Sequence, residues 1–261
     1  TVLFGTDVYR DGELSVEEFW TKTSGPHHPT TSQPPVGVFE EVFERLIATG
    51  AQVLCLTLTS KHSGTFNTAR LAAQRFGEAV QVFDSQSFSL GLGIPALVAA
   101  QTARARRSMP EILALLEDLR ERMRLMLVLD TLENLRRGGR ADAFIAVAER
   151  MTRALNIKVT VNLVEGQLRL MGATRSFKGA VRGMLAQVER LRPLEHAAVV
   201  HTRIPEIAVA VADQLSQIAS LPREHIWLRE TGAVLATHGG PGVLGILAAP
   251  IPHGRTFDLS M

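Results

Sequence analysis

The chain has 261 residues, of which 46% are hydrophobic and 21% charged, and its formal net charge is only +2. This is the composition of a globular protein with one large or two modest domains, and so small a surplus of positive charge excludes a nucleic-acid-binding surface. The one cysteine, Cys55, excludes an internal disulfide and any cysteine metal cluster, and no apolar run is long enough to span a bilayer.

The N-terminal part is predicted to hold a strand, a helix and a polar loop. Residues 2–7 form a short apolar run typical of a strand. Ser15, with Glu18 three residues later, forms a capping box that starts a helix. Residues 27–35 end in two prolines, and no large apolar side chain interrupts this segment. We therefore expect an exposed loop or one that lines a cleft.

A second helix is predicted over residues 38–47. Its apolar residues Val38, Val42 and Leu46 recur every four positions, so we expect them to form the buried face of the helix. Gly50 is expected to end this segment.

The central stretch of the chain joins a strand to a helix. Residues 53–60 are short and apolar, as in a buried strand, and residues 69–76 favour a helix. The turn Ser63-Gly64-Thr65 between them would leave backbone N–H groups at the start of the helix, and these groups with the helix dipole favour an anion. A simpler interpretation is that Ser63 or Thr65 only caps the helix.

The rest of the first half continues the alternation of strand and helix. Residues 80–85 resemble a short strand, and residues 94–100 begin a helix. A further helix starts at Ser108, with core positions Ile112, Leu115, Leu116 and Leu119. Strands that alternate with helices predict a parallel sheet covered by helices.

The second half has a different pattern. Residues 125–130 resemble a strand, and Gly138 and Gly139 then allow a sharp turn before Arg140. Residues 157–171 read as a β-hairpin with a tight glycine turn. Further helices are predicted over residues 143–155, 177–191 and 205–219, and further strands over residues 197–202 and 226–229. We therefore expect an α+β domain, with the boundary near residues 122–124.

Several catalytic patterns are missing from the sequence. It contains no Gly-x-Ser-x-Gly elbow, no phosphate-binding P-loop, no dinucleotide fingerprint and no pair of carboxylates in a glycine-rich loop. His27 and His28 do not indicate a metal site, because adjacent side chains rarely point at one ion and matching ligands are not evident.

Hydrogen-bond donors recur instead in loops that contain glycine or proline. The hydroxyl donors lie in two segments, and Arg140 and His238 add a cation and an imidazole in two more. Each residue alone has a plainer interpretation, such as a loop contact or a salt bridge. Together they favour binding of a carboxylate or phosphate over catalysis. The hydroxyl donors are Thr30, Thr31, Ser32, Ser63 and Thr65.

Six motifs along the chain resemble the DegV family in their order and spacing. The resemblance covers residues 7–248 and rests on short motifs in loops and at strand ends. The motifs are Thr31-Ser32-Gln33-Pro34, Ser63-Gly64-Thr65-Phe66-Asn67-Thr68-Ala69, Val82-Phe83-Asp84-Ser85, Leu135-Arg136-Arg137-Gly138-Gly139-Arg140, Leu155-Asn156-Ile157-Lys158 and His238-Gly239-Gly240-Pro241-Gly242.

This resemblance implies an α/β fold of two domains. The N-terminal domain, residues 1–123, would have a parallel sheet with helices on both faces, and would lack the strand with which family members usually begin. The C-terminal domain, residues 124–261, would be α+β with a largely antiparallel sheet. Val159 stands where proline is common in the family, which we expect to alter a turn only.

The resemblance also implies a function. DegV proteins are bacterial fatty-acid-binding proteins that hold a long-chain acid in an interior tunnel, with the carboxylate at the domain interface. The better-understood members carry the acid to a separate ATP-binding kinase subunit, which forms the acyl phosphate. This resemblance implies a cytoplasmic carrier in phospholipid metabolism and not an enzyme. It implies no cofactor and no metal, and it allows a transient contact with the membrane.

The site residues follow from the matched motifs. The carboxylate would contact Thr31, Ser32, Ser63, Gly64 and Thr65. Arg140 and His238 would lie near the carboxylate and face the kinase. The alternative is a stand-alone kinase or hydrolase that uses His238 as base or nucleophile. A third interpretation is a regulatory module at a membrane surface, against which the near-neutral charge argues.

Overall fold

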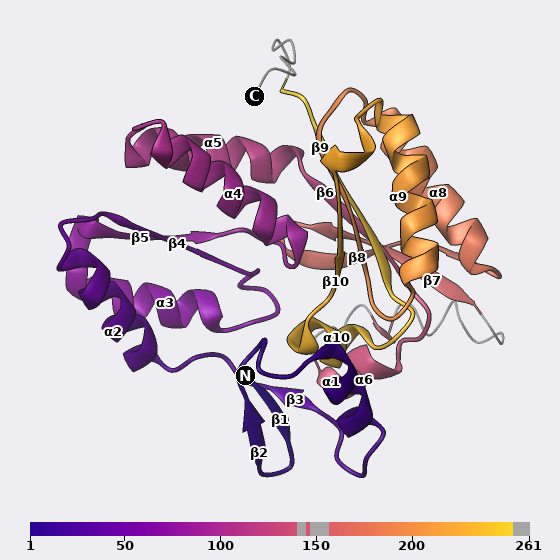
Figure 1. The fold of residues 1–261 in the computed structure, drawn as a ribbon, viewed down its shortest axis with the longest axis horizontal. Helices are drawn as coiled ribbons and strands as arrows, with labels where there is room; N and C mark the ends of the chain where they lie inside the picture. Colours follow the sequence, from indigo (N-terminus) through magenta and orange to yellow (C-terminus); the bar gives the residue numbers. More distant parts are fainter. Residues whose placement is uncertain (140–144, 147–156, 253–261) are drawn as a thin grey trace. The chain divides into compact units, whose positions relative to one another are not determined.

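The computed structural model describes residues 1–139, 145–146 and 157–252, and the chain divides into two compact units (Figure 1). Unit 1 consists of Thr1–Arg120 together with Glu165–Gln167. Unit 2 consists of Glu121–Val164 and Leu168–Met261. The fold is α/β, with a parallel sheet in unit 1 and a mixed, largely antiparallel sheet in unit 2.

Unit 1 begins with a small antiparallel sheet in the order β2-β1-β3. It is formed by β1 (Val2–Phe4), β2 (Asp7–Tyr9) and β3 (Thr30–Thr31). Phe19 of helix α1 (Val16–Thr23) covers β1, with its ring centroid 5.9 Å from that of Phe4. The sequence predicted β1 but not β2 or β3, because strands of two or three residues are too short to show alternation.

The predicted capping box of α1 is confirmed. The Ser15 hydroxyl accepts a hydrogen bond from the backbone N–H of Glu18, and the Glu18 carboxylate accepts one from the backbone N–H of Ser15. This pair satisfies two N–H groups that would otherwise lack a partner at the helix start.

The parallel sheet of unit 1 carries helices on both faces, as the sequence predicted (Figure 1). Its strands are β4 (Val53–Thr57) and β5 (Val80–Asp84), paired from Val53↔Val80 to Thr57↔Asp84. Alternate strand residues enter different cores, because successive side chains point to opposite faces. Val53 and Val80 pack with α2 (Val36–Ile47) and α3 (Thr65–Ala73), and Phe83 packs with α4 (Leu90–Arg104) and α5 (Met109–Arg122).

The predicted buried face of α2 was wrong. Val38 and Leu46 are 48% and 40% exposed, whereas Phe43 is only 2% exposed and lies in the core with Phe39. Both sets of residues repeat every four positions, so spacing alone could not choose between them. The face with two phenylalanines buries more apolar area, which decides the orientation of the helix.

The prediction for α5 was correct. Ser108 begins the helix as predicted, and Oε2 of Glu111 accepts from both the backbone N–H and the hydroxyl of Ser108 at 2.8 Å. Ile112 and Leu116 on the predicted face are 5% and 0% exposed. A 3₁₀ helix, η1 (Gln74–Ala79), joins α3 to β5.

Unit 2 is built on a six-stranded sheet in the order β10-β9-β11-β6-β7-β8. Strand β11 pairs antiparallel with both β6 and β9, β6 pairs antiparallel with β7, and β10 pairs parallel with β9. The strands are β6 (Arg124–Leu129), β7 (Lys158–Val164), β8 (Gln167–Thr174), β9 (Leu194–His201), β10 (Ile226–Glu230) and β11 (Leu244–Pro250).

Two helices cover one face of this sheet (Figure 1). These are α8 (Phe177–Arg190) and α9 (Pro205–Ala219), and their apolar residues pack in one core with Val128, Val199 and Ile246 from the central strands. The alternate residues of the same strands, which point to the opposite face, are also apolar. They include Leu125, Leu127, Ala198, Val200, Leu247 and Ala249.

Two short helices were not predicted. Residues Glu133–Gly138 form α6, and Ala233–Gly239 form α10, so His238 lies in the last turn of a helix and not in a loop. Both helices are shorter than the window in which helical periodicity can be recognised, and both contain glycine. A 3₁₀ helix, η2 (Arg223–His225), precedes β10. Of the helix predicted over residues 143–155, the structure describes only residues 145–146, which are helical.

Candidate functional site

The turn between β4 and α3 holds the two hydroxyls that the sequence singled out. Ser63 Oγ lies 2.8 Å from Thr65 Oγ1, and it also accepts a hydrogen bond from the backbone N–H of Thr65 at 3.2 Å. Gly64 is the N-cap residue of α3. The paired hydroxyls therefore lie at the N-terminus of a helix, where the dipole favours negative charge.

A second loop of unit 1 reaches this turn. Thr31 is half-buried in β3, where it pairs with Val2, and the exposed Ser32 donates its backbone N–H to the carbonyl of Thr1 at 3.1 Å. The side chain of Gln33, from the same loop, donates through Nε2 to Thr68 Oγ1 in the first turns of α3 at 2.6 Å. The loop of Thr31 and the turn of Ser63 are thus held together within unit 1.

Gly64 is the point of closest approach between these segments. A Cβ atom at this position would lie 1.9 Å from Gln33 Oε1 and 2.7 Å from Gln33 Cδ. The backbone of Gly64 is right-handed helical, with φ −73° and ψ −2°, so glycine is not required by the conformation. The absence of a side chain at Gly64 instead leaves the space that the Gln33 amide occupies.

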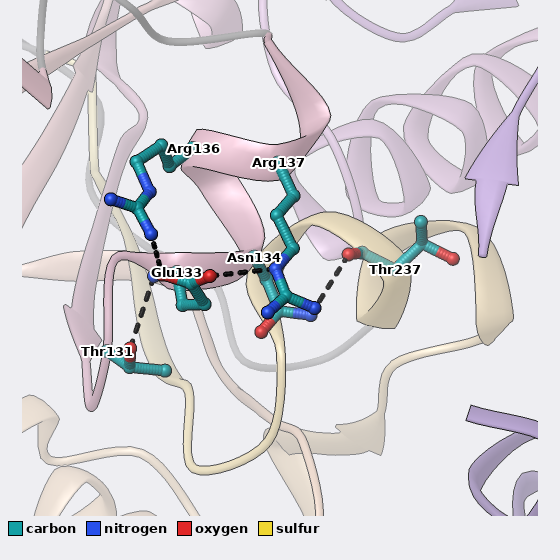
Figure 2. A network of polar contacts seen from close by, with 6 residues as sticks. All are labelled: Thr131, Glu133, Asn134, Arg136, Arg137 and Thr237. Atoms are coloured by element: carbon teal, nitrogen blue, oxygen red, sulfur yellow. Dashed lines mark hydrogen bonds and ion pairs between the residues drawn. The ribbon is translucent and has the colours of Figure 1, made fainter. Parts of the chain in front are cut away.

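In unit 2, the arginine-glycine motif lies against the histidine-glycine motif. A Cβ atom on Gly138 would lie 2.6 Å from Nδ1 of His238, so the imidazole packs directly over the Gly138 backbone. Asn134 of α6 donates its side-chain amide to the carbonyl of Thr237 in α10 at 3.3 Å (Figure 2). Two motifs that are about a hundred residues apart in sequence are therefore neighbours.

Glu133 organises the two exposed arginines at the end of α6. Its Oε1 accepts from Nε of Arg137 at 2.7 Å, and its Oε2 accepts from Arg136 (Figure 2). The hydrogen bond from Arg137 and the charge of Arg136 lower the pKa of the Glu133 carboxyl. The backbone N–H of Glu133 donates to Thr131 Oγ1 at 3.1 Å, so Thr131 satisfies a donor at the start of α6.

The loop after α10 also depends on close contacts to glycine. Gly242 has φ +76°, and a Cβ atom there would lie 2.9 Å from Cβ of Asp130. The Asp130 carboxylate in turn forms a salt bridge with Nζ of Lys158 at 2.6 Å. Lys158 belongs to the fifth matched motif, so that motif and the histidine-glycine motif meet at Asp130.

The structure groups the predicted site residues by unit. Thr31, Ser32, Ser63, Gly64 and Thr65 all belong to unit 1, and His238 belongs to unit 2. Arg140 lies outside the described residues. The sequence did not predict the contacts of Gln33, Thr68, Asn134 and Asp130, although Gln33 and Thr68 belong to the matched motifs.

The cysteine and the possible metal ligands among the described residues do not indicate a thiol or metal site. Cys55 is half-buried beside the core of β4, and burial raises the pKa of its thiol, which disfavours the nucleophilic thiolate. Among the described residues, no group of three or more His, Cys, Asp or Glu side chains could hold a metal ion. None of the described helices has both the length and the apolar character that crossing a membrane requires.

Comparison with known proteins identifies the family. A family model described as "Uncharacterised protein, DegV family" matches residues 1–250. This chain belongs to the DegV family. A DegV domain-containing protein of Deinococcus radiodurans is 32% identical over 257 residues, which cover 96% of this chain and 89% of that protein.

Solved structures of DegV proteins share this fold. One from Thermus thermophilus, reported for its fatty acid binding, is 33% identical with a TM-score of 0.86, and the match covers 96% of this chain and 90% of that one. DegV of Bacillus subtilis, described as a fatty acid binding protein, is 28% identical with a TM-score of 0.80, covering 95% and 89%. The predicted family and fold class are therefore confirmed.

Proposed function

We propose that this DegV protein binds a long-chain fatty acid and presents its carboxylate to a separate ATP-binding kinase subunit. The observation that carries the proposal is the junction in unit 1, where the loop of Thr31 and the turn of Ser63 meet at the N-terminus of α3. The fatty-acid binding described for the relatives from Thermus thermophilus and Bacillus subtilis supports the choice of ligand.

The chemistry of this junction suits a carboxylate. Neutral hydroxyls at Thr31, Ser63 and Thr65 can donate to its oxygens, and the dipole of α3 adds favourable electrostatics. A carboxylate buried without such donors would cost several kcal/mol. Donors are therefore needed wherever the head group enters a largely apolar site.

The acyl tail supplies the affinity. Each buried methylene contributes about 0.8 kcal/mol, so a tail of ~15 methylenes gains on the order of 12 kcal/mol before the cost of ordering the ligand. Burying this tail requires continuous apolar surface.

In the proposed reaction, a carboxylate oxygen attacks the γ-phosphorus of ATP and the bond to ADP breaks. Phosphoryl transfer depends on positioning and charge stabilisation more than on a protein nucleophile, so the carrier needs no catalytic base. We propose that residues 1–123 hold the carboxylate and that residues 124–261 include the kinase-facing side chains Arg140 and His238. The use of ATP makes the cytoplasm the proposed location.

The test begins with the organic extract of the purified protein, in which mass spectrometry should find a fatty acid in stoichiometric amount. The Thr31→Ala/Ser63→Ala double variant should then retain much less acid, at an unchanged melting temperature. Thr49→Ala is a matched control, because this exposed hydroxyl donates to the carbonyl of Leu46 at the end of α2. Equal retention by the double variant and the control would contradict the assignment of the donors.

The kinase step needs its own assay. Arg140→Ala should keep the bound acid but lower the rate of acyl phosphate formation by the ATP-binding subunit. The alternative function, a stand-alone kinase or hydrolase, requires that the purified chain alone turn over ATP with oleate and lose this activity in His238→Ala. That result would replace the carrier proposal.

A further inference from the structure

Gln33 connects two segments of unit 1 that are distant in sequence. Its Nε2 lies 2.6 Å from Thr68 Oγ1, and the Thr68 hydroxyl itself donates to the carbonyl oxygen of Gly64 at 3.1 Å. The Thr68 side chain is buried, whereas Gln33 is exposed and lies over the turn from outside. The Gln33 amide thus forms one wall of the turn.

The hydrogen bonds continue from Gln33 to Ser63. The carbonyl of Gly64, which accepts from Thr68, belongs to the same peptide group as the N–H of Thr65, which donates to Ser63 Oγ at 3.2 Å. Hydrogen bonds at both ends of one peptide group polarise it and reinforce each other. Donation from Gln33 through Thr68 therefore strengthens the bond that holds the Ser63 hydroxyl.

We propose that Gln33 is a positioning residue of the carboxylate site, which fixes the Ser63 hydroxyl and sets its separation from Thr31. The inference rests on the proposed function, since it concerns how tightly that site holds a fatty-acid carboxylate. Gln33 acts through Thr68 and Gly64 and does not itself contact the ligand.

The same geometry assigns a role to Gly64. A Cβ atom there would overlap Gln33 Oε1 at 1.9 Å, and the right-handed backbone conformation of Gly64 is one that alanine also adopts. Gln33 is a flexible, exposed side chain, so Gly64→Ala should displace the amide without unfolding the protein. Gly64→Ala and Gln33→Ala should therefore break the same contact.

The experiment compares the affinities of variants for two ligands, oleate and oleyl alcohol, which share a tail but differ in head group. Gln33→Ala, Gly64→Ala and Thr68→Val should each weaken oleate binding roughly fivefold, the effect of losing one hydrogen bond. Binding of oleyl alcohol should change little, because it lacks the carboxylate that the turn positions. The Gln33→Ala/Gly64→Ala double variant should lose no more affinity for oleate than the single variant that binds oleate less tightly.

Two controls separate positioning from general damage. Gly37→Ala changes a glycine of α2 that has no atom within 4 Å of its added Cβ, so oleate affinity should not change. Thr68→Ser keeps the hydroxyl and should bind oleate nearly as well as the wild type. Melting temperatures of all variants identify any loss that comes from instability.

The outcomes separate this inference from the proposed function. Equal losses for oleate and oleyl alcohol, fully additive losses in the double variant, or unchanged oleate affinity in Gln33→Ala would each overturn the role of Gln33. If the wild-type protein binds oleate, the proposed function survives these results. If the wild type binds neither ligand, the proposed function fails first, and the role of Gln33 fails with it.

Discussion

Replacing Gly138 by alanine tests whether the packing of His238 over α6 is essential to unit 2. The added Cβ would lie 2.6 Å from Nδ1 of His238 and 3.3 Å from its Cε1, whereas ordinary van der Waals contact begins at 3.4 Å. The imidazole must therefore move away from α6. Overpacking of this kind costs about 1–3 kcal/mol, from which the helix propensity of alanine recovers up to ~1 kcal/mol.

We expect Gly138→Ala to lower the free energy of unfolding by about 1–2 kcal/mol, equivalent to a melting temperature lower by roughly 2–8 °C. The chain has two tryptophans, one in each unit, so a Trp20→Phe background makes Trp227 the reporter of unit 2. Denaturant unfolding followed by its fluorescence then measures the unit that contains the substitution.

A matched glycine and a double variant make this test decisive. Gly183→Ala in α8 has no atom within 4 Å of its added Cβ, so it should gain up to ~1 kcal/mol from helix propensity. In a His238→Ala background the overlap is removed, so Gly138→Ala should no longer destabilise. Gly138→Ala as stable as the wild type, or equally harmful with and without His238, would refute the proposed packing.

Two further predictions concern the cores of the units. Phe43→Ala, which empties a position that is 2% exposed, should cost about 3–5 kcal/mol, whereas Val38→Ala on the outer face should change stability by less than ~0.5 kcal/mol in urea unfolding. Burial lowers the pKa of His201 below its usual 6.5, while Glu230 and Glu206 partly oppose this shift. As the pH falls from 7 toward 5, the unfolded chain protonates His201 more readily than the folded chain does. The stability that comes from keeping His201 neutral is therefore present above the unfolded pKa and is lost over this pH range. His201→Gln should make the urea midpoint depend less steeply on pH, and a dependence as steep as that of the wild type would contradict this prediction. His196, whose pKa is also lowered by burial, contributes to the dependence that remains.

Elements with strong local signals could be predicted from the sequence. The contacts of Ser15 with Glu18 and of Ser108 with Glu111 set the starts of α1 and α5, because their hydrogen bonds join residues only three positions apart. The turn at Glu165-Gly166 likewise set the hairpin of β7 and β8, since both residues have positive φ. In each case the determining interaction lies within a few residues of the chain.

Properties that depend on distant contacts could not be predicted in this way. The orientation of α2 was wrong because both of its apolar faces have helical spacing, and only the packing of Phe43 against β4 and β5 distinguishes them. The helix α10, with His238 in its last turn, was missed because its seven residues contain no extended periodic pattern. For the same reason the sequence marked Ser63 as a donor but not the contact of Gln33, which joins residues 35 positions apart.

Two glycines of the matched motifs, Gly64 and Gly138, lie at such distant contacts. A glycine in a loop is commonly interpreted as a demand for an unusual backbone conformation, but Gly64 has an ordinary right-handed φ of −73°. It is glycine because Gln33 of another motif lies where its side chain would be, and Gly138 stands in the same relation to His238. Each of these glycines therefore specifies which second motif lies beside it, and the sequence alone cannot reveal that partner. The variants test this interpretation in two ways. Shortening His238 should restore the stability lost in Gly138→Ala, whereas Gly64→Ala and Gln33→Ala should have the same effect singly and together, because both break one contact.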